Sequence, residues 1–228
     1  MAESEKSKWT RPILLIALAV PLSLFFFLYY GAEQRFEHVP FQYEDIPDGD
    51  TVYHTLPAFS MVRVNGDTIT DEDLRGRITL MSFFSVDDDA DLKTTVLLGN
   101  LQRSYDNVDW DMDPPFLFIS VNTGDSSAAV RAFRDEIEAD PSRWWMLYGP
   151  QTDVLKLGAE SFYLDAFVGK APGFEPFTAQ QVALIDKAGR VRKYYTATDL
   201  QEERNIQEDL IALLRLDYPE EIERMQKN

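Results

Sequence analysis

Hydrophobic residues fall into short runs that alternate with segments of helical periodicity over most of the chain. Residues 78–84 and 116–121 are apolar at nearly every position, which predicts strands buried on both faces of a sheet. Residues 144–148 form a shorter run of the same kind, for which we expect a third strand. Residues 61–69 and 181–195 each carry two apolar stretches around a turn that contains glycine, which predicts two β-hairpins.

Four segments carry apolar residues at intervals of three and four, which predicts amphipathic helices. Ser126 or Ser127 can cap the second of them, because a serine hydroxyl accepts a hydrogen bond from a free N–H group. The apolar positions are Leu92, Val96, Leu101 and Tyr105, then Val130, Phe133 and Ile137, then Val154, Leu155 and Phe162, and finally Ile206, Leu210, Leu213 and Leu214. Strands that alternate with helices and end in a hairpin predict an α/β fold, a thioredoxin-like mixed sheet flanked by helices.

One N-terminal transmembrane helix is expected to precede this domain. Residues 13–30 form an uncharged run of eighteen residues, close to the ~20 that cross a bilayer as a helix. Basic residues lie before the run at Lys6, Lys8 and Arg11, so the positive-inside rule places residues 1–12 in the cytoplasm. A cleaved signal peptide is the alternative, but so long a run that ends in two tyrosines suits a cleavage site poorly.

This topology predicts a single-pass protein of a bacterial inner membrane with its C-terminal domain in the periplasm. Residues 31–52 are polar, acidic and rich in turn-forming residues, so we expect a tether there. Residues 53–228 then form the folded domain. The membrane itself is therefore one predicted partner, bound through the N-terminal helix.

The charge and the absence of cysteine exclude several classes of function. The chain holds 39 acidic and 22 basic residues, a net charge of -17, so we expect no nucleic-acid partner. Such acidity also serves solubility or adaptation to salt. The 228 residues include no cysteine, which excludes disulfides, thiolate catalysis and cysteine-held metal sites. We predict neither a catalytic residue nor a bound cofactor.

Four aspartates in five positions, Asp87, Asp88, Asp89 and Asp91, form the most unusual local feature. Clustered carboxylates can hold a hard cation such as calcium. The stretch has no glycine and no regular ligand spacing, however, and it precedes a predicted helix. Acidic side chains at that position cap N–H groups and meet the positive end of the helix dipole. We therefore favour capping and solvation over a metal site.

Two aromatic pairs and one histidine are weaker candidates. Trp144-Trp145 and Tyr194-Tyr195 are able to face a partner, although burial in a strand explains at least one residue of each pair. His54 is a possible lone metal ligand, but a single histidine near the entry to a strand is more often a surface or hydrogen-bonded residue.

Four motifs follow one another in the folded domain: LPAF at 56–59 with Asn65-Gly66, TDEDLRGR at 70–77, ISVN at 119–122 and VALIDKAGR at 182–190. In this order they resemble the Sco/SenC family, membrane-anchored thioredoxin-fold factors that help assemble the copper site of cytochrome c oxidase. The resemblance covers residues 56–216.

The departure from the family pattern carries the functional prediction. After its first core strand the family has C-x-x-x-C, and Asp87 or Asp88 stands here for the first cysteine, Asp91 or Leu92 for the second. Thr178 stands for the histidine ligand of the family. A cuprous ion needs thiolate, thioether or imidazole, which none of these residues provides. We therefore predict no metal site.

The resemblance implies a redox-inactive assembly, accessory or scaffold factor of cytochrome c oxidase or an associated respiratory complex, with subunits of that complex as partners. The alternative is a copper carrier whose ligands are not cysteines or come from a partner. A thioredoxin-like reductase or peroxidase is a third class, which the lack of a thiolate nucleophile argues against.

Overall fold

A computed structural model describes residues 19–23, 26, 43–45, 51–86, 91–105, 116–162, 180–197, 200–220 and 223. The chain divides into two units, Met1–His38 and Val39–Asn228. In the first unit, residues 19–23 and 26 are helical. Within the described part of the chain, no helix is long and apolar enough to cross a membrane. The rest of the expected anchor, residues 13–30, lies outside the described residues.

The second unit is built on a seven-stranded mixed sheet with the strand order β4-β3-β7-β6-β5-β8-β9. The central strands β5, β6 and β7 are parallel, and the flanking pairs are antiparallel. The three predicted apolar strands and both predicted hairpins are thus confirmed. The strands are β3 (Ser60–Arg63), β4 (Thr68–Thr70), β5 (Ile78–Phe84), β6 (Phe116–Asn122), β7 (Trp144–Tyr148), β8 (Gln181–Ile185) and β9 (Val191–Thr196).

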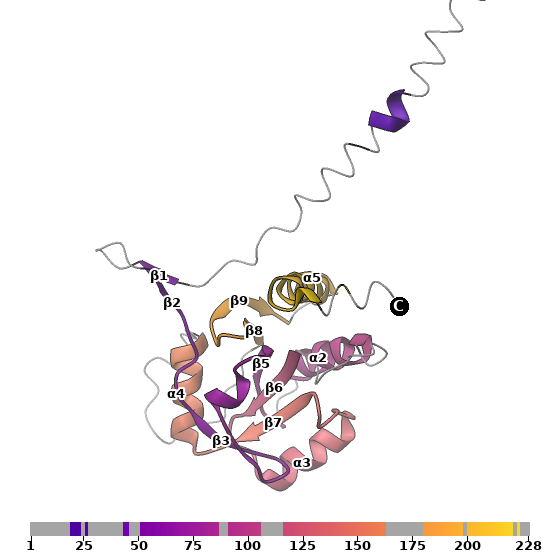
Figure 1. Cartoon of the computed structure of the whole chain (residues 1–228). Helices are drawn as coiled ribbons and strands as arrows, with labels where there is room; N and C mark the ends of the chain where they lie inside the picture. The colour runs from indigo at the N-terminus through magenta and orange to yellow at the C-terminus, as the bar shows by residue number, and fades with distance from the viewer. Residues whose placement is uncertain are drawn as a thin grey trace, which may run out of the picture. The chain divides into compact units, whose positions relative to one another are not determined.

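Helices cover both faces of this sheet (Figure 1). Buried residues of α2, α3 and α5 form one core with the sheet, and those of α4 and the 3-10 helix η1 form a second core on the other face. The four predicted helices are confirmed. They are α2 (Asp91–Tyr105), α3 (Ser127–Glu136), α4 (Gln151–Phe162) and α5 (Leu200–Asp217), and η1 spans Asp71–Leu74.

The two-sided core explains why the central strands are apolar throughout. Ile78 and Leu80 of β5 belong to the first core, whereas Met81 and Phe83 belong to the second, because side chains alternate along a strand. All seven residues of β5 and all seven of β6 are buried. The continuous apolar runs in the sequence are therefore the signature of strands covered on both sides.

Two details of the helices refine the prediction. Ser126, one of the two serines named from sequence, is the cap of α3, and its hydroxyl oxygen accepts a hydrogen bond of 3.2 Å from the Ala129 N–H. The spacing predicts that Val96 lies on the buried face of α2, and this prediction is wrong, since Val96 is 57% exposed. The helix turns Leu97 and Leu98 toward the core instead.

A small two-stranded sheet lies in the segment expected to be only a tether. It pairs β1 (Tyr43–Asp45) with β2 (Thr51–Tyr53). No strand is predicted there from sequence, because strands of only three residues are too short to show an apolar alternation. The chain then reaches the main sheet, where the Val191 N–H donates to the His54 carbonyl at 2.8 Å.

Candidate functional site

The parallel strands β5, β6 and β7 have their carboxyl ends on the same side of the sheet. This carboxyl-terminal edge, not an outermost strand, is the candidate site. Ligands of open α/β sheets bind at the carboxyl ends of parallel strands, where loops lead from strand to helix. Here β5 leads toward α2, β6 toward α3 and β7 toward α4. Of the predicted site residues, Asp91 and Leu92 begin α2, the helix that follows β5.

The structure describes only part of the predicted ligand set. Asp91 and Leu92 are the first two residues of α2, and their side chains are not described. The positions Asp87, Asp88 and Thr178 lie outside the described residues. Both interpretations of the acidic cluster, helix capping and a hard-cation site, therefore stay predictions. Within the part of the chain that is described, no group of three or more histidine or acidic side chains could hold a metal ion.

A network of hydrogen bonds fixes the chain at the point where β5 leaves the sheet. One carboxylate oxygen of Asp125, Oδ2, accepts from the Val86 N–H at 2.8 Å and from the Asn122 amide at 2.6 Å. Asn122 Oδ1 in turn accepts from the N–H groups of Gly124 at 3.1 Å and of Asp125 at 2.7 Å. The loop after β6 thereby holds the beginning of the loop after β5.

Thr123 ties the same two strand ends from the β6 side. Its backbone N–H and its hydroxyl both donate to the Phe84 carbonyl, at 2.9 and 3.2 Å. Asn122 and Thr123 are 2% and 1% exposed, so these bonds are shielded from water. In the sequence, Asn122 stands out only as part of a motif, and Asp125 is not among the predicted site residues. The signal for both was the Asn-x-Gly-Asp spacing, which is typical of a side chain that bonds its own turn.

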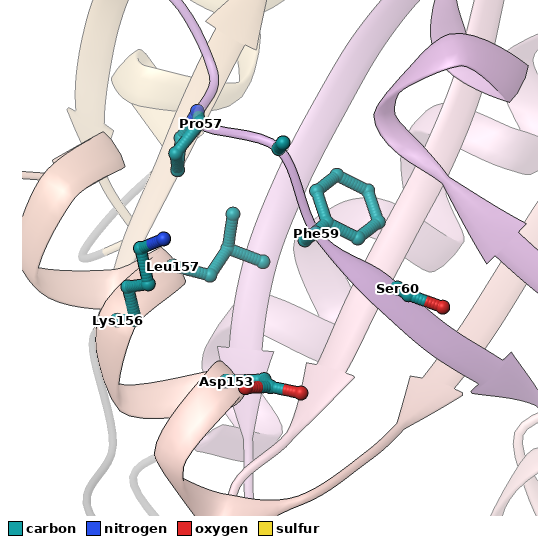
Figure 2. A pocket seen from close by; sticks show the side chains of 7 residues that line it. Pro57, Phe59, Ser60, Asp153, Lys156 and Leu157 are labelled. Carbon is teal, nitrogen blue, oxygen red and sulfur yellow. The ribbon is translucent and has the colours of Figure 1, made fainter.

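A cavity of about 340 Å³ opens at this edge, between the entry to β3 and the first turns of α4 (Figure 2). Since β3 runs antiparallel to β7, its first residues lie where β7 ends. Figure 2 shows Leu157 between the helix and the strand entry. The lining residues are Pro57, Ala58, Phe59, Ser60, Asp153, Lys156 and Leu157.

The cavity has an apolar floor and a charged rim. Phe59 and Leu157 are 8% and 1% exposed, whereas Lys156 is exposed and Asp153 half-buried. Such a lining suits an apolar side chain of a peptide whose polar backbone stays at the rim.

The remaining candidates from sequence are mostly part of the core. Trp144 is 1% exposed, Trp145 9% and Tyr195 1%, which confirms that strand burial explains at least one residue of each aromatic pair. Tyr194 is half-buried and packs against the second core. His54 is half-buried near the start of β9, consistent with a hydrogen-bonded residue.

A buried ion network lies in the turn between β8 and β9, at the opposite edge of the sheet. Asp186 and Arg192 are each 1% exposed, and Asp186 Oδ2 lies 3.3 Å from Arg192 Nη1 and 2.9 Å from Arg190 Nε. Asp186 Oδ1 accepts from the Ala188 and Arg190 N–H groups. These bonds close the turn, so we assign the network to the stability of the hairpin.

Comparison with known proteins gives similarity in structure only. No protein-family model matches the sequence, and no curated protein matches it significantly. Among solved structures, a SCO1/SenC family lipoprotein from Bacillus anthracis str. Ames is 22% identical, with 71% of this chain and 96% of that chain covered and a TM-score of 0.61.

Two further structures show the range of similar proteins. BsSco, a member of the Sco family of cytochrome c oxidase assembly proteins, is 17% identical, with 72% and 95% coverage and a TM-score of 0.55. A putative protein disulfide isomerase from Bacteroides thetaiotaomicron is 15% identical, with 77% and 94% coverage and a TM-score of 0.54. The fold is thus thioredoxin-like, as predicted, and Sco-family proteins are among those that share it.

Proposed function

We propose that this chain is a Sco-like protein that works without thiol or copper chemistry, as an assembly or accessory factor of cytochrome c oxidase or an associated respiratory complex. The observation that carries the proposal is a fold shared with Sco-family proteins in a sequence of 228 residues that has no cysteine. Thiol–disulfide exchange requires a thiolate, so this route to catalysis is closed. The protein then acts by binding, and it is not an enzyme.

The site supports binding in two ways. The Asn122–Asp125 network holds the end of β5 and the end of β6 together, which keeps this edge of the sheet rigid. The neighbouring cavity offers an apolar floor formed by Phe59 and Leu157. A rigid edge beside an apolar cavity loses little conformational entropy when a partner peptide binds.

A membrane anchor is part of the proposal. Residues 13–30 are uncharged and follow three basic residues, which supports one membrane helix with the folded domain in the periplasm. Anchoring confines the domain to the surface where respiratory complexes lie and so raises its effective concentration. A periplasmic reporter fused after Asn228 should be active, whereas activity of a cytoplasm-only reporter at the same point would refute this topology.

Removal of the protein from the cells that produce it tests the function. We expect a lower level of assembled cytochrome c oxidase and a lower oxygen-uptake rate, both restored by the wild-type chain. A chain without residues 13–30, exported with a cleavable signal, should restore less, because it is no longer held near its partner. Unchanged oxidase in cells without the protein would contradict the proposal.

The rival function, a copper carrier with ligands other than cysteine, makes a different prediction. If the proposal is right, the full-length protein should take no cuprous ion from a colorimetric chelator, because carboxylates and hydroxyls are poor ligands for this soft ion. An unrelated acidic protein of similar net charge provides the control. A one-to-one cuprous complex of sub-nanomolar affinity would favour the carrier.

A further inference from the structure

The first residue of β3 has a backbone side that no strand covers. In antiparallel pairing, alternate residues of a strand direct their N–H and C=O groups toward the partner strand. The Val64 N–H donates to the Met146 carbonyl of β7 at 3.1 Å. By alternation, Val62 and Ser60 direct their backbone groups to the same side. Because β7 ends at Tyr148, opposite Val62, no described strand reaches Ser60 there.

The uncovered backbone continues into the segment before β3. Ala58, two positions ahead of Ser60, makes no backbone hydrogen bond to the described part of the chain. Ala58 and Ser60 are both exposed, so another molecule can reach them. Both residues line the cavity beside α4 (Figure 2). The cavity therefore borders a free edge at which an extended chain can add to the sheet.

The floor of the cavity offers an apolar contact at the same place. The side chains of Phe59 and Leu157 are buried and belong to the second core. The cavity volume of about 340 Å³ is more than twice the ~150 Å³ that hold a benzene molecule. The cavity thus has room for one apolar side chain together with part of its own backbone.

The rim of the cavity carries two charges of opposite sign. Asp153 lies in the first turn of α4, where the positive end of the helix dipole stabilises a carboxylate. Lys156 is exposed, and its ammonium group forms no ion pair with any described residue, although the chain has 39 acidic residues. Figure 2 shows Lys156 toward Pro57 and Asp153 toward the other end of the cavity. The Lys156 end therefore favours a negative group.

We propose that residues 58–60 and this cavity bind an extended segment of a partner protein in which an apolar residue has an acidic neighbour. The backbone of the partner bonds to residues 58–60, its apolar side chain lies on the cavity floor, and its carboxylate pairs with Lys156. In strand addition, main-chain bonds supply affinity and side-chain pockets supply specificity. The inference rests on the proposed function, because it names the kind of segment that the binding edge accepts.

Binding of labelled peptides to the full-length chain in neutral detergent tests the proposal, with fluorescence anisotropy as the measurement. The probe is an eight-residue glycine–serine peptide with one central leucine and one glutamate beside it, made in both orders. The better order should bind at least about tenfold tighter than the same peptide with serine in place of leucine. It should bind about threefold tighter than the peptide with glutamine in place of glutamate, and this difference should shrink as salt rises.

Methylated peptides test the strand addition itself. Only one edge of an added strand faces residues 58–60, so only every second backbone N–H of the peptide can donate to them. N-methylation of one alternating set should weaken binding about fivefold or more, because it removes hydrogen-bond donors. N-methylation of the other set should change the affinity less than about twofold.

Substitutions in the protein assign the binding to the cavity. Ala58→Leu places a larger side chain in the cavity and should weaken binding at least about tenfold. Lys156→Gln should weaken binding of the glutamate peptide about three- to fivefold and leave the glutamine peptide unchanged. Lys156 is exposed, so this variant tests the site even if Ala58→Leu does not fold. The matched control is Lys93→Gln, which removes the same charge from an exposed position on α2, on the other face of the sheet.

Several results would overturn the proposal. Equal affinity for the leucine and serine peptides would do so, as would equal losses in the Lys156 and Lys93 variants or equal effects of the two methylated sets. Displacement of the peptide by free leucine would identify a small-molecule site instead. Recovery of respiratory-complex subunits with the protein, while no peptide binds, would refute this inference and leave the proposed function intact. Peptide binding in the expected pattern without any such subunit would do the reverse.

Discussion

Replacement of Asp125 by alanine should destabilise the protein and loosen the chain at the candidate site. The carboxylate Oδ2 holds two donors, the Val86 N–H at 2.8 Å and the Asn122 amide at 2.6 Å. A hydrogen bond to a charged group contributes about 1.5–3 kcal/mol when it is shielded, and less where water can replace the lost acceptor. Asp125 is half-buried, so we expect a total loss of about 2 kcal/mol in the free energy of unfolding.

Urea unfolding of the full-length protein in neutral detergent measures this loss, with near-ultraviolet circular dichroism as the probe. Asp125→Asn keeps one carbonyl oxygen and should lose less than half as much. Asp135→Ala is the surface control, because Asp135 is exposed and pairs only with its neighbour Arg134 among the ion pairs described, at 2.5 Å. It should cost less than about 0.5 kcal/mol.

Hydrogen exchange separates a local effect from a global one. In Asp125→Ala the Val86 amide should exchange faster than the amides of central β6. A free energy of unfolding within about 0.5 kcal/mol of wild type, together with unchanged protection of Val86, would refute the idea that this network fixes the end of β5.

Three further predictions follow from buried polar groups. Asp186→Ala should cost about 3–5 kcal/mol in unfolding free energy, because it removes the buried carboxylate that pairs with the buried side chain of Arg192; a loss below about 1 kcal/mol would contradict this. Burial raises the pKa of Tyr105 to about 12 from 10.0, so the folded state favours the neutral phenol and loses that stability as pH rises from 10 to 12. Between pH 10 and 12 the free energy of unfolding of Tyr105→Phe should therefore fall less than that of the wild type, with a difference of about 2 kcal/mol at pH 12. Equal falls in the two proteins would refute this prediction. Trp144→Phe should cost about 3 kcal/mol or less, since it removes the 2.9 Å hydrogen bond to Ser120 and some packing; unchanged thermal stability would contradict it.

Much of the fold could be predicted because burial leaves a periodic trace in the sequence. The apolar runs of β5 and β6 identify strands covered on both faces, and the spacing of Leu210, Leu213 and Leu214 identifies the buried stripe of α5. Spacing alone failed where the apolar residues of a helix fit two different buried faces equally well. Val96 is an example, because it lies next to the face of α2 that is buried. The short β1–β2 pair left no apolar pattern to detect.

The polar contacts were beyond prediction for a physical reason. Asp186 and Arg192 read as ordinary surface charges of a hairpin, and only the fold shows that they are buried together. Arg63 and Trp145 are 82 positions apart in the numbering, and strand pairing brings them into contact. Sequence locates the candidate site after β5, but it does not show which distant side chains the fold brings into contact.

The central claim is that a Sco-like domain without thiol or copper ligands acts by binding a respiratory complex. The most direct test is affinity purification of the tagged full-length protein from its native membranes in mild detergent, with quantitative mass spectrometry against untagged membranes. The account predicts enrichment of cytochrome c oxidase subunits, or of subunits of an associated respiratory complex or its assembly intermediates. Recovery of the intact, folded protein without any respiratory-complex subunit would contradict it.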